Sequence, residues 1–159
     1  MEKDKKELSF FKVTTIVLAS VFLSLSLIAY LKREFFKRIY LKYKRFDEIK
    51  KCRDFINKSS DKEENSAIQY KIARIYHASL GDHSQAILEY KKFLEEYPDS
   101  ILLENVIYYM ARAWEHLGNF ERAKEEYEKL IHQFPEGMRV DDAKLRIEDI
   151  DTIVDGINI

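Results

Sequence analysis

The chain has 159 residues, with 27 Lys plus Arg against 28 Asp plus Glu, and it contains only four Gly, two Pro and one Cys. The length fits one modest domain, and the scarcity of turn-forming residues argues against a β-sandwich or barrel. We therefore predict an all-α fold. The near-zero net charge combines a basic segment, residues 1–45 with a balance of +7, and an acidic remainder with a balance of −8. An acidic remainder argues against nucleic-acid binding, which needs Lys and Arg at the phosphates.

Near the start of the chain, residues 13–31 (VTTIVLASVFLSLSLIAYL) form an uncharged stretch of nineteen residues. A helix of this length spans about 28 Å, close to the hydrocarbon core of a bilayer at about 30 Å. We predict an N-terminal tail over residues 1–12 and a single transmembrane helix over 13–31. A buried core helix and a signal peptide cleaved after Ala29 are the alternatives, but Leu27 is a poor residue for a cleavage site.

Basic residues flank this stretch on both sides. Lys32, Arg33, Lys37 and Arg38 come directly after it, and we predict that they lie at the membrane interface. Seven Lys and Arg lie after the stretch up to residue 45 and four precede it, so the positive-inside rule favours a cytoplasmic body. A short tail retained inside, with the body translocated to the periplasmic or exported side, is the alternative orientation.

Residues 32–65 are predicted to contain a basic juxtamembrane helix. Its aromatic and aliphatic residues recur at steps of three and four, as on one face of a helix: Phe35, Phe36, Ile39, Tyr40, Tyr43 and Phe46. This face either packs as the first helix of the following domain or contacts anionic lipid. The segment also suggests a degenerate first repeat, because Phe46 and Ile49 precede His83 and Ala86 by thirty-seven residues.

A period of thirty-seven residues dominates the second half of the chain. The residues that recur at this spacing are small or special ones: Gly81 and Gly118, Ala86 and Ala123, Tyr90 and Tyr127, and Pro98 and Pro135. Each Gly ends a first helix, each Ala lets two helices approach closely, and each Pro ends a second helix. The first copy carries one extra residue before its Gly. The pattern predicts repeated helical hairpins.

The two segments IARIYHASLGDHSQAILEYKKFLEEYPDS and MARAWEHLGNFERAKEEYEKLIHQFPEG resemble the tetratricopeptide repeat family. The resemblance covers residues 66–137 and implies a short solenoid of two units. Residues 138–159 are predicted to form a capping helix and tail, because Val140, Ala143, Ile147, Ile150 and Val154 step by three and four.

No pattern of catalytic or metal-binding residues stands out. The four His lack a metal-ligand spacing, the Gly are isolated rather than forming a phosphate loop, and Cys52 has no evident His base. We therefore expect no enzymatic activity, no cofactor and no metal, and we interpret Cys52 as a packing residue.

The resemblance implies that the first helix of each unit lines a concave groove for a protein or peptide partner. The positions predicted to face it are Tyr70, Arg74 and His77 in one unit, and Tyr108, Arg112 and Glu115 in the next. Each triplet steps by four and three along one helical face. The sequence thus predicts a membrane-anchored adaptor or assembly factor. The alternative is an accessory subunit of a membrane complex, held mainly through its transmembrane helix.

Overall fold

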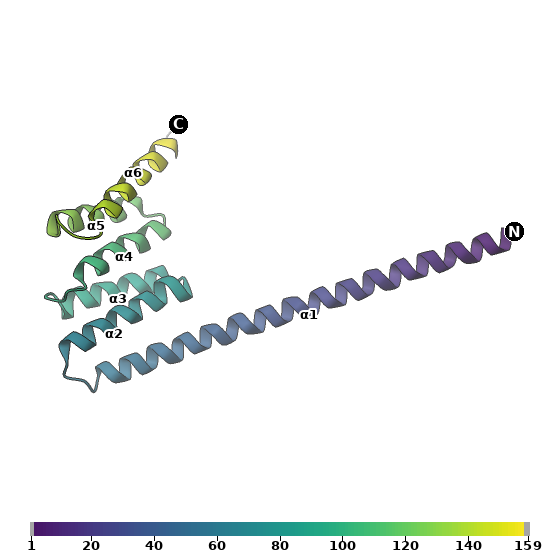
Figure 1. The fold of residues 1–159 in the computed structure, drawn as a ribbon, viewed down its shortest axis with the longest axis horizontal. Helices are drawn as coiled ribbons and strands as arrows, with labels where there is room; N and C mark the ends of the chain where they lie inside the picture. The colour runs from purple at the N-terminus through teal and green to yellow at the C-terminus, as the bar shows by residue number, and fades with distance from the viewer. Residues whose placement is uncertain (1, 158–159) are drawn as a thin grey trace. The chain divides into compact units, whose positions relative to one another are not determined.

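The computed structural model describes the backbone of residues 2–157 and the side chains of residues 22–156. In this part of the chain all regular secondary structure is helical, which confirms the predicted all-α class (Figure 1). The elements are α1 (Glu2–Ile56), α2 (Lys62–Arg74), the π-helical turn η1 (Ile75–Leu80), α3 (His83–Glu96), α4 (Leu103–His116), α5 (Phe120–Gln133) and α6 (Val140–Ile157).

The chain divides into two compact units, Met1–Lys44 and Arg45–Ile159. The first unit consists of α1, and the last residues of this helix, from Arg45 onward, belong to the second unit. The sequence favours one continuous helix here because Gly and Pro are absent from its first eighty residues. Ion pairs between neighbouring turns, such as Lys51 Nζ to Asp47 Oδ2 at 2.7 Å, add to this preference.

The prediction of a transmembrane helix over residues 13–31 is wrong. Over the residues whose side chains are described, no helix holds an apolar stretch of the length that a bilayer requires. The physical reason lies in the charges: the described apolar residues 22–31 run directly into Lys32, Arg33 and Glu34. The earlier part of the predicted span, residues 13–21, and the predicted tail, residues 1–12, lie outside the residues with described side chains. The single-pass membrane location falls with this prediction.

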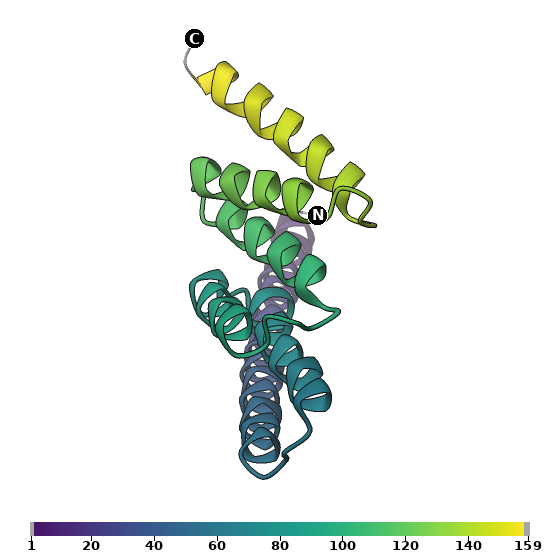
Figure 2. The ribbon, with the colours of Figure 1, turned by 90° about the vertical axis from the view of Figure 1, so that its left-hand side faces the viewer.

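The second unit is built from helices that pack in the order of the sequence. The turn η1 extends α2, and together they pack against α3, whereas α4 packs against α5, and α5 against α6 (Figure 2). One group of buried residues, which includes Ile72, Tyr90 and Phe93, fills the first hairpin. A second group, which includes Tyr127 and Leu130, fills the next hairpin and reaches α6. This is the architecture of a helical-repeat solenoid.

The joints between paired helices use the residues that the period singled out. Gly81 and Gly118 have φ angles of 66° and 72°, in the left-handed region that glycine adopts without strain. The next residue in each copy caps the following helix. The side chain of Asp82 accepts a hydrogen bond from Gln85 N at 3.0 Å, and that of Asn119 accepts one from Arg122 N at 3.1 Å.

The extra residue of the first copy is accommodated in the helix itself. Ala73 and Ala111 are thirty-eight residues apart, whereas Gly81 and Gly118 are thirty-seven apart, so the additional residue lies between Ala73 and Gly81. The π-helical turn η1 occupies this interval, and such a turn absorbs one residue without ending the helix. The turn therefore changes the direction of the side chains that come after Arg74.

The last helix, α6, closes the solenoid as the predicted apolar pattern requires. Val140, Ala143 and Ile150 are buried, and Ile147 is partly buried beside them. At the outer edge, Lys124 Nζ of α5 forms an ion pair with Asp151 Oδ1 of α6 at 2.7 Å. The apolar stripe thus continues the core, while acidic residues occupy the exposed side of the terminal helix.

Candidate functional site

An open pocket of about 360 Å³ is lined by α2 with η1, by the start of α3 and by α4. We call it the histidine pocket, and its lining residues are Arg74, His77, Ala78, His83, Tyr109, Arg112 and His116. Three of the residues that the sequence assigned to a groove, Arg74, His77 and Arg112, are brought together here. The fourth, Tyr70, is half-buried next to this pocket, with its ring centroid 6.4 Å from that of Tyr109.

The other two residues assigned to the groove, Tyr108 and Glu115, are placed inside the solenoid. Tyr108 is buried, and its ring centroid lies 5.7 Å from that of Tyr127 on α5. Tyr109, the next residue, lines the pocket instead, and the guanidinium of Arg74 lies 3.6 Å from the centroid of its ring. A shift of one residue along a helix turns a side chain by about 100°, which explains the exchange.

Glu115 lies on α4 with its carboxylate turned toward α5 and α6. It accepts a hydrogen bond from Tyr127 Oη at 2.7 Å, and two from Arg146, from Nη2 at 2.6 Å and from Nε at 3.1 Å. Its side chain is only 7% exposed. Burial alone would raise the pKa of Glu115, but the hydrogen bonds from Arg146 and Tyr127 outweigh burial and lower it. The carboxylate is therefore ionised and already engaged at neutral pH.

Three histidines meet in the pocket from three different elements. The ring centroid of His77, on η1, lies 5.1 Å from that of His83, at the start of α3, and 5.5 Å from that of His116, at the end of α4. The rings of His83 and His116 stack at 4.4 Å. Sequence reasoning missed this cluster because spacings of six and thirty-three residues match no metal or catalytic motif. The extra residue before Gly81 was the one available signal.

The environment of these rings favours the neutral form. Burial, followed by the nearby charges of His83 and Arg74, lowers the pKa of His77 from its ordinary value of 6.5 to about 4. Burial and His116 lower the pKa of His83 as well, while Asp82 opposes that shift. A buried imidazole with arginine neighbours resists protonation because a second positive charge in the same space is unfavourable.

Acid is therefore expected to weaken the fold through His77. In the unfolded chain this residue takes up a proton below pH 6.5, but in the folded protein it stays neutral until about pH 4. The contribution of neutral His77 to the free energy of unfolding is therefore fully present above pH 6.5 and is lost as the pH drops toward 4. From pH 7.5 to 5.0 we expect wild type to lose about 1 kcal/mol more unfolding free energy than His77→Gln, after allowance for screening by solvent.

Urea unfolding at the two pH values, followed by circular dichroism, measures this difference. His132→Gln is the matched control, because His132 is exposed on α5 and outside the pocket. It should keep the pH dependence of the wild type. An equal loss of stability in wild type and His77→Gln would show that His77 does not remain neutral in the folded state.

The remaining predicted residues lie on α1. Lys32 and Arg33, together with Lys37 and Arg38, were predicted to lie at a membrane interface, and that prediction is lost with the transmembrane helix on which it depended. Cys52 is buried among the core residues of the first hairpin. Burial raises the pKa of its thiol, so the neutral form is favoured.

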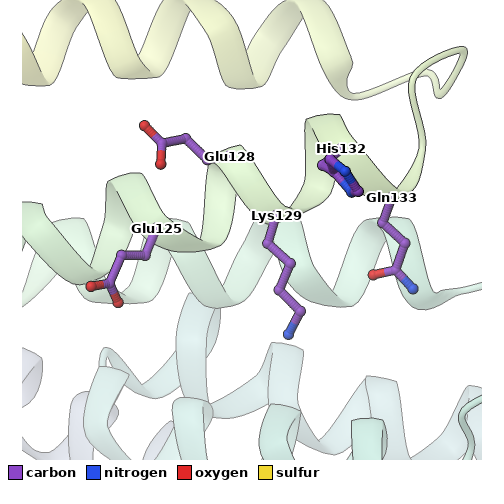
Figure 3. Close-up of a pocket in the computed structure, with 5 residues that line it drawn as sticks. All are labelled: Glu125, Glu128, Lys129, His132 and Gln133. Carbon is purple, nitrogen blue, oxygen red and sulfur yellow. The ribbon is translucent and has the colours of Figure 1, made fainter.

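A second hollow lies along α5 and is lined by Glu125, Glu128, Lys129, His132 and Gln133. Figure 3 shows that all five side chains come from this one helix and that Lys129 and Gln133 extend to the same side of it. A binding pocket generally needs walls from more than one element. The histidine pocket is lined from three elements and is therefore a stronger candidate than this hollow on α5.

Metal binding finds no support in the histidine pocket. Among the residues with described side chains, no group of His, Cys, Asp and Glu is arranged to hold a metal ion. The pocket lining contains no carboxylate, and the guanidinium groups of Arg74 and Arg112 would repel a cation. The charge of the site suits an anion or a hydrogen-bond acceptor instead.

Comparison with known proteins supports the architecture. Residues 67–100 and 105–137 match the family model of the tetratricopeptide repeat. Two segments of the chain, which together make up less than half of it, thus match this repeat. The resemblance noted in the sequence is thus confirmed for the repeats, though not for the membrane anchor. No curated protein matches the chain significantly. Repeats of this kind indicate a role in protein–protein interaction or as a scaffold.

Proposed function

We propose that this tetratricopeptide repeat protein is an adaptor that holds a partner protein or peptide against the face formed by α2, η1 and α4. The observation that carries the proposal is the histidine pocket itself, which both leading helices line and which a single repeat could not form. Solenoids of stacked hairpins use such continuous faces for binding.

The chemistry of this face supports a protein partner. Tyr70, Tyr109 and Arg74 form a contiguous group on it, in which Arg74 is held against the ring of Tyr109. Tyr and Arg are enriched among the residues that dominate binding energies at interfaces. Because Arg74 is already ordered by the ring, less side-chain entropy is lost when a partner binds. In this proposal Tyr108 and Glu115 support the face from within rather than contact the partner.

Site-specific photocrosslinking in cells that express the full chain tests the proposal. A photoreactive amino acid at Ala78, an exposed residue of the pocket lining, should capture one defined protein. The same amino acid at Lys92, which is exposed on α3 and outside the pocket, should not. Arg74→Gln should reduce capture from Ala78. Equal capture from both positions, or none from Ala78, would contradict use of this face.

A further inference from the structure

The lining of the histidine pocket contains two arginines and no acidic residue. The side chains of Arg74 and Arg112 line it from α2 and α4. No ion pair joins Arg74 to an acid within the described residues, and Arg112 approaches only Glu115, at 3.4 Å and without hydrogen-bond geometry. Since Glu115 is shared with Arg146 and Tyr127, its charge is largely neutralised inside the solenoid. The pocket lining therefore carries two guanidinium groups and no carboxylate of its own, which favours an anionic ligand.

Two buried ring nitrogens in the pocket also lack a hydrogen bond. They are Nδ1 of His77 and Nδ1 of His83, and neither has a partner among the described residues. His77 is only 8% exposed, so an unpaired polar atom there is unfavourable. A protonated imidazole would turn such a nitrogen into a charged donor, and that donor requires a negatively charged acceptor. The arginines of the lining and the unpaired histidine nitrogens would thus both be satisfied by a negatively charged hydrogen-bond acceptor.

We infer that the histidine pocket receives a carboxylate of an acidic peptide segment in the partner, and that this binding is coupled to proton uptake by the histidine cluster. The inference rests on the proposed function, since it concerns the same face. It adds the chemical class of the partner and a regulation by pH: the acidic segment is held more tightly in mild acid than at neutral or alkaline pH.

The direction of this coupling depends on the charges that face the cluster. Around His77 and His83 these groups are Arg74 from α2, Asp82 and Tyr90 from α3 and its cap, and Tyr109, Arg112 and His116 from α4. The Asp82 carboxylate caps α3 by accepting from Gln85 N. A bound carboxylate offsets the arginine charges and favours the protonated imidazoles. By linkage, protonation then favours the carboxylate by the same factor.

Isothermal titration of the full chain with acetyl-hexaglutamate-amide at pH 7.5 and pH 5.8, at constant ionic strength, tests the coupling. The Glu side chains, with an ordinary pKa of about 4.3, remain ionised at both pH values, so a change in affinity reports on the protein. We expect binding to be about tenfold tighter at pH 5.8, equivalent to one added charge interaction in the pocket. The acetyl-hexaglutamine-amide peptide should not bind at either pH.

Three variants separate the parts of the inference. Arg74→Gln should lose binding at both pH values, and the double variant His77→Gln with His83→Gln should lose the gain in affinity between pH 7.5 and pH 5.8. Lys92→Gln, which removes an exposed charge on α3, should match the wild type. Carbon-13 spectra of the histidine rings should show His77 and His83 titrating at higher pH when the peptide is bound.

Each contrary outcome is informative. An affinity that does not change with pH, or a gain that persists in the double variant, would overturn the coupling while capture from Ala78 still upheld the proposed function. Inorganic phosphate that binds as tightly as the peptide at equal ionic strength would overturn the assignment to a carboxylate. An absence of binding by hexaglutamate at both pH values would overturn the inference as a whole.

Discussion

The Glu115→Ala variant should lose about 3 kcal/mol of unfolding free energy, because removal of this buried carboxylate breaks three hydrogen bonds, one from a buried hydroxyl and two from a guanidinium. Glu115 is the junction of three helices: its carboxylate on α4 accepts hydrogen bonds from Tyr127 on α5 and from Arg146 on α6. Without it, the Tyr127 hydroxyl is left buried without its acceptor, and Arg146 keeps only its ion pair with Asp149 on the exposed side of α6, at 2.8 Å. The side chain of Arg146 is 30% exposed and can partly rehydrate, which keeps the estimate at the lower end of the range.

The loss should be concentrated at the end of the solenoid. We expect the amide hydrogens of α6 to exchange faster in Glu115→Ala, whereas those of α3 should change little. Urea unfolding and hydrogen exchange by mass spectrometry measure the two effects. Asp151→Ala is the matched control, because the pair of Lys124 and Asp151 also joins α6 to the solenoid, through α5, but lies at the exposed surface. If both variants lose the same unfolding free energy, burial of the Glu115 carboxylate is not the cause of its contribution to stability.

The repeat architecture could be predicted from the sequence because its signals are local. Glycine is favoured where the backbone adopts a positive φ, as at Gly81 and Gly118. Asp and Asn are favoured at the start of a helix, where their side chains accept a backbone hydrogen bond, as Asp82 and Asn119 do. The apolar steps in residues 140–150 likewise predicted which side chains of α6 are buried, whereas Val154, the last residue of the predicted stripe, is exposed. Such features depend only on neighbours within a few residues, so they can be recognised in a single sequence.

The contents of the pocket could not be predicted in the same way. The stacking of His83 on His116 depends on how α3 and α4 pack, and no spacing in the sequence records it. The π-helical turn η1 rotates His77 toward them, and its only trace is one extra residue. Glu115 lies on the predicted face of its helix, yet Arg146, thirty-one residues later, draws its carboxylate inward. Partners distant in the sequence decide these orientations.

The transmembrane prediction failed for a different reason. It depended on hydropathy over nineteen residues, of which the described side chains cover only residues 22–31. The described part of the stretch, residues 22–31, leads straight into a charged segment of the same continuous helix α1. Over the described residues this helix is not apolar for long enough to span a bilayer.

The opposite end of the solenoid depends on a second buried carboxylate, and there the Arg53→Met variant should lose about 3 kcal/mol of unfolding free energy. Glu89 on α3 has a side chain only 6% exposed, and Arg53 Nη2 of α1 lies 2.6 Å from its Oε1. Gln69 Nε2 and Gln85 Nε2 also donate to this carboxylate, at 3.0 and 3.1 Å. Neutral donors cannot balance its charge, so removal of Arg53 leaves a buried anion without a counter-ion.

A second substitution distinguishes the buried charge from the lost contact. In the double variant Arg53→Met with Glu89→Leu the carboxylate is gone as well, and well-packed apolar pairs often replace buried ion pairs without loss. We therefore expect most of the stability lost in Arg53→Met to return. Arg45→Met is the control on the same helix, because its partner Glu48 is partly exposed and keeps a second ion pair, with Lys71, so the loss of Arg45 should cost little. Urea unfolding of the four proteins gives the comparison.

Recovery in the double variant would show that the Glu89 carboxylate requires the end of α1 to be in place. The segment from Arg45 to Ile56 then supplies a counter-ion to the first repeat, as α6 does to the second through Arg146 and Glu115. Both repeats would depend on a flanking helix for charge as well as for apolar cover. A double variant as unstable as Arg53→Met would instead indicate that α1 is held by the packing of Ile49 and Cys52 in the core.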